Sequence, residues 1–363
     1  MVLDRLPIKA SDPISGELRQ MRADLLANPR DAAAAVRLAR RYFELASAEG
    51  DPRYIGYAEA ALRPWTALPE PPTEVVLVRA LLRQYRHEFI PAMADLDRVL
   101  MSQPGNVEAI AWQVALHRVQ ADYDKAREAC KRLAATGTPL EAIACHAALD
   151  SINGKSREAH AKLAAALTRY KAQSTEYLQW LLVRLGEMAL RFGDKALAEK
   201  HFKDAIATGH TDGFVLAAYA DLLLDANRAG EVLVLLRNWE SSDVLLLRLA
   251  LAADALKSAN AEKYRRALAD RFAAAALRGD RLHLQEEARF ELYLRKNPAK
   301  AVKLALEDWA VQREPRDARF LMEAALAAGN AEAARPALEW MDRTGYEDPL
   351  YRTLANSLRK IGK

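Results

Sequence analysis

The sequence predicts an all-α protein built from stacked pairs of antiparallel helices, and three observations carry this prediction. The apolar fraction of 51% comes largely from Ala and Leu, which favour helices, with only eight Phe and six Trp in 363 residues. No run of alternating β-branched residues is long enough to indicate a sheet. A pattern of two helices around a tight turn also returns at nearly constant intervals, which is typical of a solenoid.

Residues 1–30 are expected to form an extended arm and a capping helix, which opens at Asp12-Pro13 with an N-cap and a proline in the first turn. Residues 31–66 then form a divergent first helix pair. Four prolines between Pro64 and Pro72 make residues 67–72 a rigid connector, because proline cannot continue a helix. The sequence leaves open whether this connector separates two domains or only widens a loop.

The clearest helix pair lies at residues 182–206. Its first helix contains Leu185-Gly186, its turn is Gly193-Asp194, and its second helix contains Ala198 and Phe202. This pattern resembles the tetratricopeptide repeat (TPR), a 34-residue helix-turn-helix unit with the pattern W-x2-L-G-x2-Y…A-x3-F…P. The small residues and Phe202 are expected where helices touch, so they indicate packing and not function.

The same pattern continues in both directions along the chain. Units are expected to begin near Thr73, Val107, Leu140, Gln179, Gly213, residue 243 and Leu282, with a last unit around Leu321 to Gly345. The resemblance therefore covers an array at 73–347, followed by a capping helix at 348–363. It implies a right-handed superhelical solenoid of eight to nine repeats with helical caps at both ends.

In the TPR family the first helices of the pairs line a concave groove, where a peptide or helix of a partner usually binds. Carried over to this chain, the resemblance places on the groove Leu77, Leu81, Gln84, Arg118, Trp180, Val183, Glu187, Phe214, Asp221, Glu286, Phe290, Tyr293, Arg319 and Glu323. The first half is apolar, and the second half is aromatic and acidic. We expect a partner's apolar segment in the first half and its basic side chains against the acids of the second. The Lys, Asn and Arg set with which some TPR domains hold a chaperone's C-terminal carboxylate is replaced by Leu, Ala and acids, so such a ligand is not expected.

Catalytic motifs are incomplete, and the chain is not expected to be an enzyme or to bind a cofactor. Gly154-Lys155-Ser156 ends like a phosphate-binding loop, but Leu149 stands where the motif needs its first glycine. His87-Glu88 begins like a zinc-protease helix, but Pro91 replaces the second histidine.

A metal site is not expected either. Cys130, Cys145, His146 and His160 are ligand types for zinc, but their spacing lacks the short pairs that bring ligands together. Both cysteines fall on consecutive helices, so a bridge is conceivable. Two buried free thiols are the expectation, because unpaired cysteine behaves as a small apolar residue.

The charges and termini give further expectations. The chain has 53 Lys and Arg against 49 Asp and Glu, a net charge of +4, and its densest basic run, 257–281, is expected to be a solvated helix face. Nucleic-acid binding is therefore not expected. No apolar run reaches the about 18 residues of a membrane span, and no secretory signal is present as written. A cytoplasmic location is expected, or a periplasmic one if a signal has been removed.

Together these features predict a scaffold or adaptor that binds a segment of a protein partner in the groove. The alternative is a regulatory or sensory module that binds a signalling peptide and changes the shape of its superhelix. The partner and the oligomeric state stay open.

Overall fold

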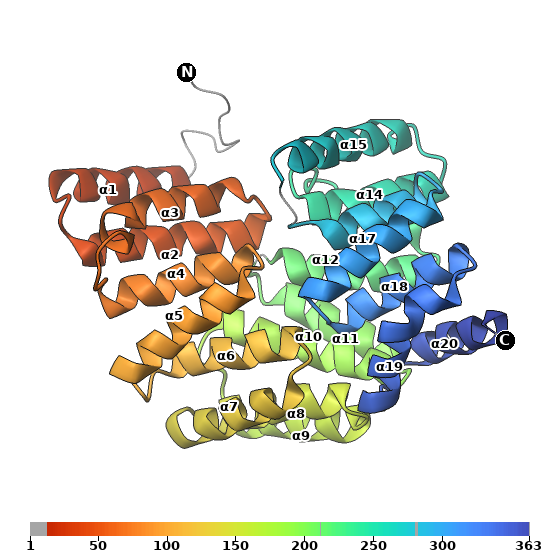
Figure 1. The fold of residues 1–363 in the computed structure, drawn as a ribbon, viewed down its shortest axis with the longest axis horizontal. Helices are drawn as coiled ribbons and strands as arrows, with labels where there is room; N and C mark the ends of the chain where they lie inside the picture. The colour runs from red at the N-terminus through yellow and green to blue at the C-terminus, as the bar shows by residue number, and fades with distance from the viewer. Residues whose placement is uncertain (1–12, 211, 280–281, 363) are drawn as a thin grey trace. The chain divides into compact units, whose positions relative to one another are not determined.

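The computed structural model describes residues 13–210, 212–279 and 282–362; the predicted arm and the Asp12 cap lie outside this range. The described residues form helices and no strand, which confirms the all-α prediction (Figure 1). The helices are α1 (Pro13–Ala27), α2 (Ala32–Glu49), α3 (Arg53–Thr66), α4 (Thr73–Tyr85), α5 (Phe89–Ser102), α6 (Val107–Val119), α7 (Tyr123–Thr136), α8 (Pro139–Ile152), α9 (Ser156–Arg169), α10 (Thr175–Arg191), α11 (Lys195–Ala207), α12 (Gly213–Asp225), α13 (Ala229–Leu235), α14 (Asp243–Ala255), α15 (Ala261–Leu277), α16 (Leu284–Tyr293), α17 (Pro298–Val311), α18 (Pro315–Ala327), η1 (Ala331–Ala334, a 3-10 helix), α19 (Arg335–Thr344) and α20 (Pro349–Ile361).

Each helix pair from α4 to α19 turns through one residue with a positive φ. These residues are His87, Ala121, Gly154, Gly193, Asn227, Lys257, Lys296 and Gly329. The intervals between them follow the predicted phase: 34 residues separate His87 from Ala121, and 34 separate Gly193 from Asn227. The helix-pair architecture that the TPR resemblance implies is therefore confirmed. Left-handed backbone favours glycine, yet five of these eight positions hold another residue, so glycine alone does not mark the repeat.

The packing role of Gly186 is also confirmed. A Cβ atom at this position in α10 would lie 2.7 Å from the Phe202 ring of α11. Both residues are buried. Only glycine lets the two helices of this pair approach so closely.

In two of the helix pairs, the second helix departs from the repeat pattern. α13 has seven residues and ends at Leu235, so it is shorter than the second helices α11 and α15 of the neighbouring pairs. The last pair begins its second helix as η1, and Pro336 stands in the first turn of α19. Proline has no N–H group for the i−4 bond, so the chain enters α19 through a 3-10 turn.

The chain divides into two compact units. Of the described residues, 13–47 and 51–104 form the first unit, and 48–50 together with those from 105 to 362 form the second. This boundary falls at Pro104–Gly105, whereas the connector 67–72 joins α3 to α4 inside the first unit. In the first unit, Tyr54, Leu62 and Val78 belong to one buried core.

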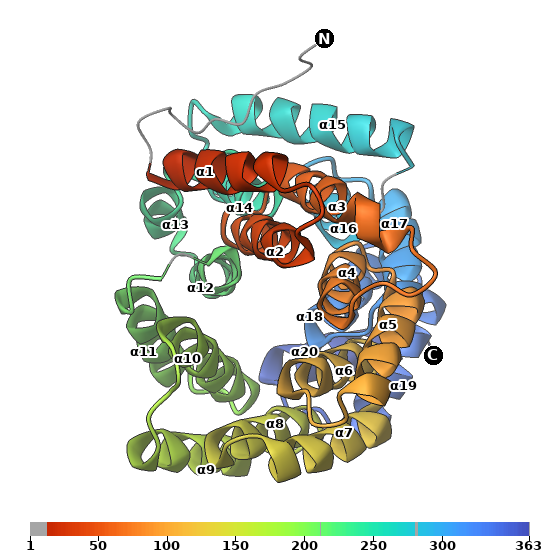
Figure 2. The ribbon, with the colours of Figure 1, turned by 90° about the vertical axis from the view of Figure 1, so that its left-hand side faces the viewer.

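The end of the second unit returns to its beginning, through a contact that we call the seam. The backbone N–H of Arg313 donates to Val119 O at 2.6 Å, and Trp340 Nε1 donates to Tyr123 Oη at 2.8 Å. Figure 2 shows α6, α8, α10 and α12 following one another around the inner side of this unit, with α7, α9 and α11 outside them. The seam joins α6–α10 to residues 313–351.

Aromatic side chains fill the seam. Trp340, Tyr346 and Tyr351 are at most 6% exposed, and their rings follow one another with centroids 5.0 and 4.9 Å apart. Arg191 Nε on α10 donates to Tyr346 Oη at 3.2 Å. Burial of this much aromatic surface holds the two ends of the second unit together.

The expectation of two free thiols is wrong. Cys130 on α7 and Cys145 on α8 form a disulfide, with Cα atoms 5.8 Å apart. The hairpin of two antiparallel helices brings the two positions within disulfide range, which their sequence separation alone does not reveal. The disulfide also removes both thiols from the set of possible zinc ligands.

Candidate functional site

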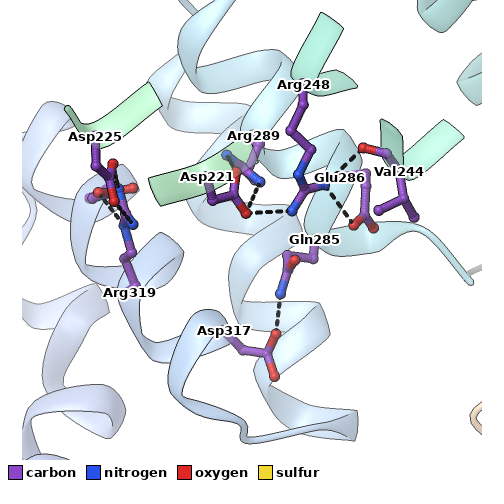
Figure 3. A network of polar contacts seen from close by, with 10 residues as sticks. Asp221, Asp225, Val244, Arg248, Gln285, Glu286, Arg289, Asp317 and Arg319 are labelled. Atoms are coloured by element: carbon purple, nitrogen blue, oxygen red, sulfur yellow. Dashed lines mark hydrogen bonds and ion pairs between the residues drawn. The ribbon is translucent and has the colours of Figure 1, made fainter. Parts of the chain in front are cut away.

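The inner helices of the second unit carry a network of arginines and acids (Figure 3). Asp221 on α12 accepts hydrogen bonds from Arg248 on α14 at 2.7 Å and from Arg289 on α16 at 2.9 Å. Arg248 also donates to Val244 O and lies 3.7 Å from Glu286. Burial by itself raises the pKa of Asp221, but the two arginines outweigh it and hold the pKa well below its usual range.

A second ion pair links α12 with α18. Arg319 donates two parallel hydrogen bonds to Asp225, at 2.7 and 2.6 Å (Figure 3). Its Nε donates a third, to Glu323, at 2.9 Å. Glu323 also accepts from the hydroxyl of Tyr293, whose pKa is raised by burial and then by this carboxylate. The bidentate geometry fixes α18 against α12.

Aromatic rings and guanidinium groups alternate from Trp180 to Arg316 in a row that we call the ladder, and one more ring stacks on its first member. Tyr177 stacks on Trp180 with centroids 5.9 Å apart, and the Arg184 guanidinium lies 5.6 Å from the Trp180 ring. Arg184 also lies 5.0 Å from the ring of Phe214, and Arg316 lies 5.3 Å from that ring. Cation–π contacts therefore connect α10, α12 and α18.

Glu314, just before α18, collects several of these cations. It pairs with Arg316 at 2.8 Å and with Arg118 of α6 at 3.2 Å. Burial raises the pKa of Glu314, but Arg316, Arg118 and Arg184 together lower it to about 2. One carboxylate is thus shared between two guanidinium groups in direct contact.

A cavity of about 470 Å³ opens on this inner surface, between α10–α12 and α18–α20. It is lined by Glu187, Leu190, Arg191, Gly193, Lys195, Phe202, Phe214, Ala217, Ala218, Asp221, Leu222, Asp225, Arg248, Pro315, Arg316, Arg319, Phe320, Tyr346, Asp348, Pro349, Leu350, Tyr351 and Thr353. All of these residues belong to the second unit. The volume lies within the range of about 300–1,000 Å³ found for ligand pockets.

Two buried acids near this surface do not line the cavity. Asp308 accepts from Gln312 at 3.2 Å, and Asp317 accepts from Gln285 and from the backbone N–H of Glu314. Burial, and next the charge of a neighbouring glutamate, raises the pKa of Asp308 to about 7. The hydrogen bonds tie Asp317 to the start of α18 and Asp308 to the end of α17, so we assign both carboxyl groups a structural role.

The structure brings together only part of the predicted groove. Of the predicted residues, those that line the cavity are Glu187, Phe214, Asp221 and Arg319. Those that are buried are Leu77, Leu81, Val183, Glu286 and Phe290, and those that are half-buried outside the cavity are Gln84, Arg118, Tyr293 and Glu323. Trp180 is 38% exposed. Leu77, Leu81 and Gln84 belong to the first unit and the others to the second.

The acids expected to meet a partner's basic side chains have arginine partners within the chain. Glu187, for example, lies 2.9 Å from Arg184 and 3.5 Å from Arg191. Asp221, Glu286 and Glu323 are paired as described above. Sequence reasoning missed these arginines, although Arg184, Glu187 and Arg191 stand at i, i+3 and i+7 of one helix, the spacing at which charged side chains on one face meet.

Several cations of the basic run 257–281 form ion pairs within the chain. Lys263, Arg265 and Arg271 of α15 each lie within 2.7 Å of a carboxylate oxygen.

Among the described residues, no three His, Cys, Asp or Glu side chains are grouped so that they could hold a metal ion. In the same part of the chain, no helix combines the length and apolar character needed to cross a membrane.

The paired helices and their regular turns decide the fold. The chain is similar in fold to tetratricopeptide-repeat proteins. No family model and no curated protein matches it. A solved APC/C hetero-tetramer, Cut9–Hcn1, is 15% identical with a TM-score of 0.44, over 86% of this chain and 52% of that one. This chain thus spans about half of that protein's length.

The alignment with two further solved structures spans most of the length of both proteins. Yeast Tom70 is 14% identical with a TM-score of 0.33, over 96% of this chain and 92% of that one. A tetratricopeptide repeat protein from Parabacteroides merdae ATCC 43184 is 13% identical with a TM-score of 0.25, over 96% and 100%. At such low scores the fold assignment rests on this chain's own helix pairs.

Proposed function

We propose that the chain is a non-catalytic scaffold that holds a segment of a protein partner in the cavity between α10–α12 and α18–α20. The observation that carries this proposal is the cavity itself, which four predicted groove residues from α10, α12 and α18 line together. It combines apolar walls with a few fixed polar groups, as binding sites for protein segments do.

The charges of the cavity suit binding better than catalysis. Arg248 is held by Asp221, and Arg319 is held by Asp225. A group fixed in such a pair orients a ligand, whereas a general acid or base must exchange a proton with it.

The seam favours a scaffold over a module that changes the shape of its superhelix. A change of pitch would separate α6–α10 from residues 313–351 and expose Trp340 and Tyr346, which are buried. Such exposure is unfavourable, because aromatic residues contribute strongly to the stability of a core. We therefore expect the radius of gyration to stay constant when a partner segment binds.

The test uses a display library of short random peptides, selected against the full chain. Thr353 lines the cavity and is exposed, so the variant Thr353→Trp should fill the cavity without disturbing the core. Thr168→Trp on α9 is the matched control, because both threonines are exposed and both donate to a carbonyl of their own helix. Selected peptides should bind the control as tightly as the original protein and lose binding to Thr353→Trp. Selection of no peptide, or equal binding to both variants, would overturn the proposal.

A further inference from the structure

The walls of the cavity are mainly apolar and aromatic. Phe214 and Phe320 face it from α12 and α18, Tyr351 and Leu350 from α20, and Ala217 from the middle of α12. Phe320 and Tyr351 are almost fully buried, so their positions are fixed by packing. A site with rigid aromatic walls favours a flat apolar side chain, which gains contact on both faces.

Most of the charged side chains of the cavity are already neutralised by the chain. Arg319 and Arg248 have carboxylate partners at 2.6 and 2.7 Å. Arg191 lies 3.5 Å from Glu187 and donates hydrogen bonds to the hydroxyl groups of Ser151 and Tyr346. A ligand that had to break these pairs would leave a buried charge without a partner, which is strongly unfavourable.

Two cations of the cavity lack a carboxylate partner of their own. Lys195, in the first turn of α11, is exposed and has no ion pair among the residues that the structure describes. Arg316 lies at the end of the ladder with its side chain 44% exposed, and it shares its carboxylate partner, Glu314, with Arg118. The residues that line the cavity include five cations and four carboxylates, Asp348 among them, so the lining carries one positive charge in excess.

Arg316 also has a distinct geometry. Its guanidinium group packs against the ring of Phe214 at 5.3 Å while the residue lines the cavity. A planar guanidinium that stacks on one ring can stack a second ring on its free face. The ladder, in which rings and guanidinium groups alternate, would then continue into the cavity with an aromatic ring as its next member.

We propose that the cavity takes an aromatic side chain of a partner segment, stacked on Arg316, and that Lys195 pairs with an acidic residue next to that aromatic one. This inference rests on the proposed function and specifies the chemistry of the partner. Buried aromatic anchors surrounded by a polar rim are the usual source of affinity at protein interfaces. The excess positive charge selects the acidic neighbour.

The peptide selection described above tests the inference by the composition of what it enriches. Peptides whose binding Thr353→Trp abolishes should contain Phe, Tyr or Trp beside Asp or Glu. If such peptides instead lack an aromatic residue, or carry basic residues beside it, this inference fails while the proposed function stands. If no peptide depends on the cavity, both fail.

Variants of Arg316 test the stacking. Arg316→Lys keeps the charge but loses the planar face, and it should weaken the selected peptides about 3- to 10-fold. Arg266→Lys on α15 is the control, because this arginine is 74% exposed and lies away from the cavity. Unchanged affinity in Arg316→Lys would show that the cation acts as a charge only and would overturn the stacking.

Variants of Lys195 test the acidic neighbour through a double-mutant cycle. Lys195→Gln should weaken the binding of a selected peptide. The same substitution should leave unchanged the binding of the peptide in which Gln replaces the acidic residue. The loss should shrink as salt rises, because the pair is exposed. Equal effects on both peptides would show that Lys195 does not contact the acid.

Discussion

The contact between His160 and His201 should make the second unit sensitive to acid. Their Nε2 atoms lie 2.9 Å apart and their ring centroids 5.1 Å apart, so the rings meet nearly head-on. One ring donates and the other accepts, and two protonated rings cannot form this bond. His201 is 9% exposed. Burial, and then the charge of His160, lowers its pKa from 6.5 to about 4.

The direction of the effect follows from proton binding. Between these two pKa values the unfolded chain binds a proton that the folded chain excludes, so the contribution to stability is complete above pH 6.5 and declines as the pH falls. From pH 7 to pH 5 the loss is about 2 kcal/mol for His201 alone, at about 1.36 kcal/mol per pKa unit. The charged neighbours Lys200 and Asp204 act in opposite directions on this ring and are lesser causes of the shift.

The assay compares urea unfolding of the original chain and of His201→Gln at pH 7 and pH 5. Glutamine does not titrate, so the free energy of unfolding of the variant should fall by about 2 kcal/mol less than that of the original chain between pH 7 and pH 5. The carboxylates contribute equally to both proteins and cancel in this comparison. His146→Gln, on α8 and outside the pair, is the control and should follow the original chain. An identical pH dependence in His201→Gln and the original chain would refute the reasoning.

Three further variants test the packing of the second unit by denaturant unfolding. Replacing Cys130 and Cys145 together by Ser should cost about 3 kcal/mol, since the disulfide closes a loop over a sequence separation of 15; unchanged stability would show that the thiols are not joined. Gly186→Ala should cost about 1–2 kcal/mol, because the clash with the Phe202 ring outweighs the better helix propensity of alanine, and a gain in stability would contradict the close approach. Trp340→Phe should lower the free energy of unfolding by about 1–3 kcal/mol, because it leaves the buried hydroxyl of Tyr123 without its hydrogen-bond donor. A loss below about 0.5 kcal/mol, in the range of surface substitutions, would mean that this hydrogen bond does not hold the seam.

The local architecture could be predicted from the sequence because it depends on short-range signals. The close pair Gly186 and Phe202 and the turn at Gly193 mark one repeat, and the phase then follows by counting residues. Turns at Ala121 and Lys257 hold no glycine, yet the same count locates them. Helix periodicity and repeat length are properties of neighbouring residues, which a single sequence displays directly.

The site could not be predicted in the same way, because its contacts join distant segments. Arg319 and Asp225 are 94 residues apart in the sequence, and Arg289 and Asp221 are 68 apart. Whether they meet depends on small rotations between successive repeats, which add up along the array. Asp221 and Arg319, both expected on the groove, do line the cavity. The sequence assigned the charge of Asp221 to a partner's basic side chain, whereas in the structure it is paired with Arg248 and Arg289.

These internal pairs restrict how a partner can gain affinity. Breaking a buried pair such as Arg248 with Asp221 costs about 3–5 kcal/mol, because it leaves a buried charge behind. A partner that engaged the acids of the inner surface with its own basic residues would have to offset this cost at each contact. A partner whose side chain packs against the apolar walls and stacks on the exposed Arg316 leaves every buried ion pair intact. Binding energy should therefore concentrate on the apolar walls of the cavity and on the free face of the Arg316 guanidinium.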